Sequence, residues 1–402
     1  MAQPIFTLFS LWFLLLPFTI ISSLYLGIVA LDKLIAPILL IVWLVMFSLG
    51  HYRISQNKLL IIIIAFLFFF LRNISFIDNS AVYISLLKED AILFGYFCLP
   101  ILYVNNIDKV KAIGKLVSIN AAVGCTSAFL VALGLLSLPY ERFSRSRIGL
   151  DIDKSIGLFT SYGDLAQHAA FLLILSVFLP VVFVKKRKLR YLISFVAVVI
   201  VIMGLIGNQS RSFLLSIIAA FLAASFFLYR SGLKRNMLTI DILLSAVGIV
   251  LVGVATYFFV DIINLLAGLG GEQAQSTAGG RVLQYRMAFD LVKENLILGV
   301  NGDVFSRAGA SIHGVHNMWL GQLARGGVIS VAILLALLFL IFRSSLILLN
   351  NQSAKYYAIV TIGYMAAVIM STLFYPGDSV LFWVLLGVNA AIITTLKSNC
   401  VG

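Results

Sequence analysis

The stretch NMWLGQLARGGVISVAILLALLFLIF, residues 317–342, contains a single charged side chain, that of Arg325, in an otherwise apolar run. A helix needs about 20 predominantly apolar residues to cross a hydrocarbon core of about 30 Å. The stretch is long enough to do so. It therefore predicts a membrane-spanning helix, and similar runs recur along the chain.

The composition of the whole chain agrees with this reading. Of the 402 residues, 61% are hydrophobic and 11% are charged, whereas a soluble protein has about 25% charged residues. We therefore expect an all-α polytopic membrane protein, with residues 1–402 forming a single integral-membrane domain. Twelve membrane-spanning helices are expected, at residues 5–27, 34–50, 59–71, 90–104, 116–138, 164–184, 191–207, 212–229, 239–260, 317–342, 356–375 and 379–396.

Short basic loops set the expected orientation. KKRK at residues 185–188 and RSGLKR at residues 230–235 are of the kind that stays in the cytoplasm. With an even number of spans, both termini are then cytoplasmic. The net charge of +13 consequently indicates contact with anionic membrane lipids, and we expect no nucleic-acid partner.

The longest expected loop, residues 261–315, lies on the outer side between the ninth and tenth spans, and a loop of that length is usually functional or disordered. Its segment GGRVLQYRMAFDLVKEN, residues 279–295, predicts an amphipathic helix on the membrane surface or against the helix bundle. The expected apolar stripe consists of Val282, Tyr285, Phe289 and Val292, and Arg281, Gln284, Ala288 and Asn295 lie off it.

Arginines mark the outer segments. Arg211 lies in a short polar turn between the seventh and eighth spans, and polar groups at membrane depth generally face a cavity or another protein group. Arg145 and Arg147 lie in the outer loop at residues 139–155. Three further arginines near span ends, Arg72, Arg307 and Arg325, are expected to extend to the lipid headgroups.

His316 begins the tenth span and has three interpretations. With His313 it would supply two ligands of a metal site, but no HxxEH pattern or carboxylate pair accompanies them. It would otherwise be a passive residue of the membrane interface, or a general base, because histidine titrates near neutral pH. Asn317 would orient a substrate or cap the helix. We expect no metal and no cofactor.

This set of residues suits one kind of chemistry. Arginine forks bind a diphosphate bidentately and stabilise the charge that develops as it departs. A single base then deprotonates the attacking alcohol. The sequence is therefore compatible with glycosyl transfer from a polyprenyl-diphosphate donor to an acceptor hydroxyl.

A family resemblance rests on the order of four motifs. RSFLL at residues 211–215 is followed by GGR at 279–281, GVNGDVF at 299–305, and HN at 316–317 with Gly327 beyond. This order resembles the O-antigen ligase and polymerase superfamily, bacterial inner-membrane glycosyltransferases of the GT-C type. The first ligase pattern is R-x3-L. The second is HN or HS, then nine residues, then Gly, then two residues, and then Gly, Thr or Tyr. Ser330 departs from the last position.

The resemblance implies roles for individual residues. Arg211 and Arg281 would hold the diphosphate of an undecaprenyl-linked glycan, and His316 would activate the acceptor hydroxyl at the periplasmic face. The reaction would invert the anomeric centre without metal or nucleotide. The residues with weaker claims to a supporting contact are Arg286, Asn317, Arg145, Arg147 and His313.

Three functions remain open. An O-antigen ligase would transfer finished polysaccharide to the lipid A–core acceptor, and the R-x3-L and HN patterns favour it. The related O-antigen polymerase would use another lipid-linked repeat as acceptor. A transporter or flippase would bind a lipid-linked sugar without breaking bonds, but it would place polar residues near the membrane midplane. Here the polar residues concentrate at the expected outer face, which favours an enzyme.

Overall fold

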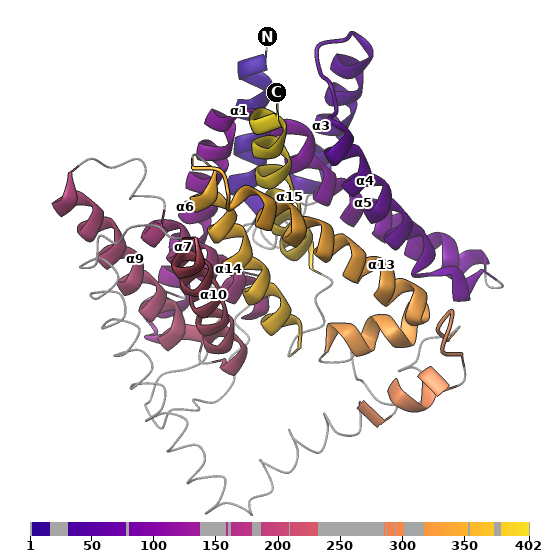
Figure 1. Cartoon of the computed structure of the whole chain (residues 1–402). Helices are drawn as coiled ribbons and strands as arrows, with labels where there is room; N and C mark the ends of the chain where they lie inside the picture. The colour runs from indigo at the N-terminus through magenta and orange to yellow at the C-terminus, as the bar shows by residue number, and fades with distance from the viewer. Residues whose placement is uncertain are drawn as a thin grey trace, which may run out of the picture.

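A computed structural model describes most of the chain as helices (Figure 1). The described residues are 2–16, 31–77, 80–136, 158–159, 162–178, 186–208, 210–231, 285–286, 288–293, 295–300, 317–352, 354–373 and 379–401. The α-helices are α1 (Ala2–Leu15), α3 (Leu31–Ser48), α4 (Gln56–Leu71), α5 (Ser80–Tyr103), α6 (Ile107–Ala132), α7 (Tyr162–Phe178), α9 (Arg187–Asn208), α10 (Arg211–Arg230), α13 (Met318–Leu348), α14 (Lys355–Thr372) and α15 (Val380–Val401). A 3₁₀ helix, η2 (Ile74–Phe76), follows α4.

Five of the described helices are long and apolar enough to cross a membrane, within Ile107–Ala132, Lys188–Asn208, Phe213–Arg230, Met318–Leu348 and Val380–Ser398. The chain is thus an all-helical polytopic membrane protein over its described part. The count of twelve spans stays a prediction. The expected ninth span and most of the expected loop at 261–315 lie outside the described residues.

Local sequence explains where key helices begin. The Ser210 hydroxyl accepts a hydrogen bond from the Phe213 amide at 3.2 Å, which caps α10. The Asn317 side chain caps α13 in the same way, accepting from the Leu320 amide at 3.0 Å. Such caps satisfy backbone donors that the first helical turn leaves unpaired. The expected short turn between the seventh and eighth spans is confirmed, because α9 ends at Asn208 and α10 begins at Arg211.

The helices pack in two groups, one formed by α6, α7, α9, α10 and α14, the other by α1, α3, α4, α5 and α15 (Figure 1). Helix α13 contacts α4, α14 and α15 and so joins the groups. Close packing relies on small residues: a Cβ atom at Gly387 of α15 would lie 2.2 Å from the Phe97 carbonyl oxygen of α5. The chain ends of α1 and α15 lie at the same end of the bundle (Figure 1).

Candidate functional site

The start of α13 is fixed on the end of α14. The Asn317 side-chain amide donates to the Leu373 carbonyl oxygen at 3.2 Å, and the Trp319 indole N–H donates to the Thr372 hydroxyl at 3.2 Å. Asn317 therefore caps the helix, as one of its two expected roles required, and also ties α13 to its neighbour. The residue immediately before it, His316, lies outside the described residues.

Helix α13 is broken at Gly327, where φ is +64° and ψ is −167°. A segment containing residues 295–300 docks against this break. The Val328 amide donates to the Leu296 carbonyl oxygen, and the Val300 amide donates to the Ala324 carbonyl oxygen, both at 2.9 Å. A Cβ atom at position 327 would lie 2.1 Å from the Ile297 carbonyl oxygen. The motif glycine is thus required both by the backbone conformation and by the close approach of another segment.

A short helical segment at residues 288–293 also packs on the first part of α13. Ala288 and Val292 are buried against Ala324, and Tyr285 packs beside them. The expected stripe was wrong in one respect: Phe289 is 54% exposed, whereas Ala288 is fully buried. Positions 285, 288 and 292 share a helix face, and a small residue at the centre allows close approach to α13. Of the two expected positions, packing on the bundle is the one observed.

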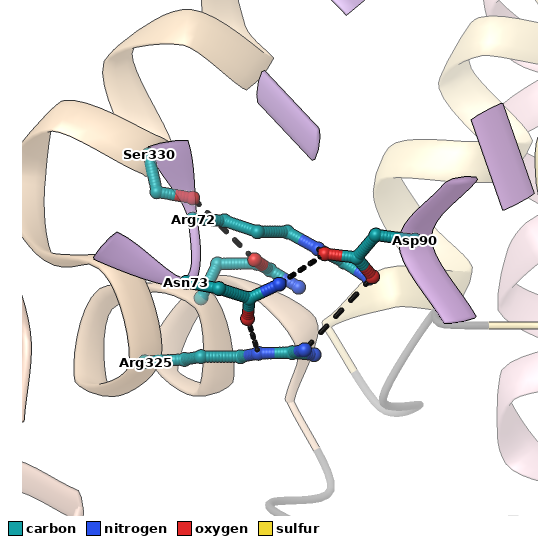
Figure 2. Close-up of polar contacts among 6 residues, drawn as sticks. Arg72, Asn73, Asp90, Arg325 and Ser330 are labelled. Carbon is teal, nitrogen blue, oxygen red and sulfur yellow. Dashed lines mark hydrogen bonds and ion pairs between the residues drawn. The ribbon is translucent and has the colours of Figure 1, made fainter. Parts of the chain in front are cut away.

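A polar cluster, formed by the buried residues Arg72, Asn73 and Asp90 and by the partly buried Arg325, lies beside the break (Figure 2). The Arg72 guanidinium binds both carboxylate oxygens of Asp90, with Nε donating to Oδ2 at 2.8 Å. The Asn73 amide nitrogen donates to the same carboxylate. Arg325 donates through Nε to the Asn73 side-chain oxygen at 2.7 Å, and its Nη2 lies 3.9 Å from Asp90 Oδ1.

The cluster corrects the expectation that Arg72 and Arg325 extend to lipid headgroups. The Arg72 side chain is 1% exposed and that of Arg325 is 23% exposed. A buried guanidinium needs a counter-charge and hydrogen-bond acceptors, and Asp90 provides them because α5 begins at Ser80, well before the expected start of the fourth span. The sequence does contain a signal for this ion pair. Arg72 follows one apolar run and Asp90 begins the next, on the same expected side of the membrane.

The backbone joins this cluster to the break. The Ser75 hydroxyl of η2 donates to the Arg325 carbonyl oxygen at 3.0 Å. A Cβ atom at Gly326 would lie 2.8 Å from the Arg72 Cα atom. The end of α4 and the η2 turn therefore hold one side of the break, while residues 295–300 hold another. This anchoring fixes the direction of the first part of α13.

A second buried polar group lies where α7 begins. The Gln167 amide donates to the Ser371 hydroxyl of α14 at 2.8 Å, and the Ser379 hydroxyl before α15 donates to the Asp164 carboxylate. The His168 ring nitrogen Nδ1 lies 2.8 Å from the Asp164 carbonyl oxygen. None of these residues belongs to a motif recognised in the sequence. Because Ser371 adjoins the α14 end that binds α13, this group lies on the same side of the bundle as Asn317.

The structure describes few of the expected site residues. His316, His313, Arg281, Arg145 and Arg147 lie outside the described residues.

Two others are described in part. Arg211 is the first residue of α10, which packs against α7 and α14, and its side chain is outside the description. Arg286 is exposed and lies two residues before the short helical segment at 288–293. The roles expected for all seven residues stay predictions.

A family model matches part of the chain. Residues 196–335 match the family model described as O-antigen ligase. The matched region runs from within α9 to just beyond the break in α13, and it includes the residues on which the resemblance rests. It confirms the resemblance to the O-antigen ligase and polymerase superfamily, whose members are membrane glycosyltransferase-like enzymes. No curated protein matches the chain.

Proposed function

We propose that the chain is an O-antigen ligase that transfers polysaccharide from undecaprenyl diphosphate to a hydroxyl group of the lipid A–core acceptor. The reaction takes place at the periplasmic face of the bacterial inner membrane. The observation that carries the proposal is the family match over residues 196–335, which contains Arg211, Arg281 and His316 in the expected order.

The proposed reaction is a direct displacement. Arg211 and Arg281 bind the diphosphate and stabilise the negative charge that it gains. His316 accepts the proton of the acceptor hydroxyl, whose oxygen forms a bond to the anomeric carbon. The bond between that carbon and the phosphate oxygen breaks, and undecaprenyl diphosphate leaves. One displacement inverts the anomeric centre and requires neither a metal ion nor a nucleotide.

The geometry around α13 supports a base at position 316. Asn317 is fixed by its cap to Leu320 and by its bond to Leu373. The break at Gly327 is held by other segments through backbone hydrogen bonds. The start of α13 is therefore held in place, and pre-organisation of this kind favours catalysis. The structural roles of Asn317 and Gly327 thus explain why these residues occur in one motif with the histidine.

An O-antigen polymerase is the second candidate, because the family match covers ligases and polymerases alike. It would use the same donor, base and arginines, and the acceptor would be a second lipid-linked repeat. The two functions differ in the acceptor alone, so the products distinguish them.

The deciding experiment is the lipopolysaccharide ladder of a strain that lacks the gene. Core lipopolysaccharide without attached O-antigen is the expected result for a ligase, whereas core bearing a single repeat would assign the polymerase function. Complementation with the wild-type gene should restore the ladder, and complementation with His316→Ala should not. A ladder unchanged by the deletion would reject both functions.

A further inference from the structure

A pocket of about 680 Å³ lies where α10 and α13 end and α14 begins. This volume is within the range of sites that bind small molecules and lipid headgroups. The residues of α13 that line the pocket come from Phe342 onward, whereas the candidate functional site lies at the start of that helix and at Gly327. The pocket is therefore separate from the candidate site, and the proposed function gives it no role.

Two cations line this pocket. Arg230, the last residue of α10, is exposed, and Lys355, the first residue of α14, is buried. The Lys355 ammonium donates at 3.0 Å to the side-chain oxygen of Gln352, an exposed residue that also lines the pocket. Over the described part of the chain, neither cation has an aspartate or glutamate within ion-pair distance. The two cations therefore favour an anion in the pocket.

Aromatic side chains form an apolar wall of the same pocket. Phe227 of α10 and Phe342 of α13 both line it, and their ring centroids lie 6.1 Å apart in an edge-to-face arrangement. Phe227 precedes Arg230 by three residues, so the two side chains share a helix face and the ring lies about one turn further from the helix end. The pocket thus has its cations at the helix ends and its apolar wall toward the helix interiors. A phospholipid has the same order of charged and apolar parts.

The position of the pocket along the helices also fits a lipid headgroup. Phe213–Arg230 and Met318–Leu348 are both long and apolar enough to cross a membrane, so the ends of these helices lie where an apolar span meets the headgroups. Arg230 begins the basic loop RSGLKR at residues 230–235, which is expected on the cytoplasmic side. Basic pockets between helices on that side are suited to anionic lipid headgroups.

We propose that this pocket binds an anionic phospholipid. Arg230 and Lys355 contact the phosphate oxygens of the headgroup, and Phe227 and Phe342 pack against the first part of an acyl chain. A zwitterionic phospholipid binds more weakly, because its own ammonium group is repelled by the two cations and the pocket lining contains no carboxylate. The site goes beyond the proposed function and does not depend on which acceptor the enzyme uses.

The experiment titrates phosphatidylglycerol into the purified full-length protein in a neutral detergent and follows the rise of the thermal unfolding midpoint. We expect Arg230→Gln to weaken binding at least tenfold, equivalent to about 1.4 kcal/mol. Arg230 is exposed, so this variant should leave the midpoint of the lipid-free protein unchanged. Lys355→Gln should also weaken binding, but Lys355 is buried and Arg230→Gln therefore decides. The matched control is Arg343→Gln, which removes an exposed arginine near the end of α13 that does not line the pocket and should bind as wild type.

Two further probes test the chemical class of the ligand. Phosphatidylethanolamine should stabilise the wild-type protein much less than phosphatidylglycerol does, and equal stabilisation would overturn the preference for an anionic lipid. Glycerol 3-phosphate has the phosphate without acyl chains, and an affinity equal to that of phosphatidylglycerol would assign the pocket to a soluble phosphate instead. Equal phosphatidylglycerol affinity of wild type and Arg230→Gln, or an equal loss in Arg343→Gln, would overturn the inference outright. The titration involves no glycan transfer, so failure of the proposed function would appear separately.

Discussion

Replacement of Gly327 by alanine should both destabilise the protein and impair its activity. The alanine would have to adopt φ of +64° and ψ of −167°, a region that residues other than glycine occupy at a cost of order 1–3 kcal/mol. Its Cβ atom would also lie 2.1 Å from the Ile297 carbonyl oxygen, so residues 295–300 would have to move away. Two backbone hydrogen bonds of 2.9 Å and a longer one of 3.5 Å join that segment to α13, and each of the two shorter ones contributes about 0.5–1.5 kcal/mol.

These contributions give a loss of about 2 to 6 kcal/mol. The control is Gly134→Ala, at a glycine with φ of +69° and no atom within 4 Å of the added Cβ, where only the left-handed backbone penalty of about 1–2 kcal/mol applies. Thermal unfolding in one detergent would compare the variants, and the rate of glycan transfer would be measured in parallel. Equal unfolding midpoints for the two variants would refute the claim that the docked segment makes Gly327 necessary.

Four other predictions concern the site and its surroundings. His316→Ala should reduce transfer by about 10²- to 10⁴-fold with donor binding retained, since it removes a base; a full lipopolysaccharide ladder in cells would contradict this. Arg211→Lys and Arg281→Lys should each lower the initial rate sharply, because lysine lacks the bidentate fork, and near-wild-type rates would remove these arginines from the diphosphate site. Turnover with a detergent-dispersed acceptor should survive EDTA, and loss restored by a divalent ion would contradict the metal-free reaction. Asp90→Asn removes the carboxylate that Arg72 binds and should lower unfolding free energy by about 3–5 kcal/mol, measured by denaturant titration; an unchanged midpoint would contradict it.

Sequence reasoning predicted helices well where apolar runs are uninterrupted, and less well where charges interrupt them. The third span was expected to begin at residue 59, yet α4 begins at Gln56 and includes a buried lysine. Lys58 donates to the carbonyl oxygens of Ile101 and Val104 at 2.8 and 2.6 Å. These acceptors belong to the end of α5 and the residue after it, and nothing in the local sequence around Lys58 identifies them.

Prediction of the candidate site was limited in the same way, because its interacting residues lie far apart in the sequence. Gly327 was recognisable from its motif. The requirement for glycine at this position comes from the docked segment at residues 295–300, which the motif does not reveal. Arg325 was expected at the headgroups because its partner Asn73 is 252 positions away. Composition and spacing therefore predicted the chemistry, whereas the partners that orient these side chains come from tertiary packing.

The length of α13 beyond its break also indicates how deep the break would lie in a membrane. The part of the helix after Gly327, Val328–Leu348, contains 21 residues and is about 32 Å long, close to the roughly 30 Å of a hydrocarbon core. A helix of that length would place the break at a boundary of the core, level with the headgroups. If the proposed function holds, two lipid-anchored substrates would then react without lifting their tails from the leaflet. Their encounter would be a diffusion problem in two dimensions, governed by surface density and bilayer thickness and independent of bulk concentration.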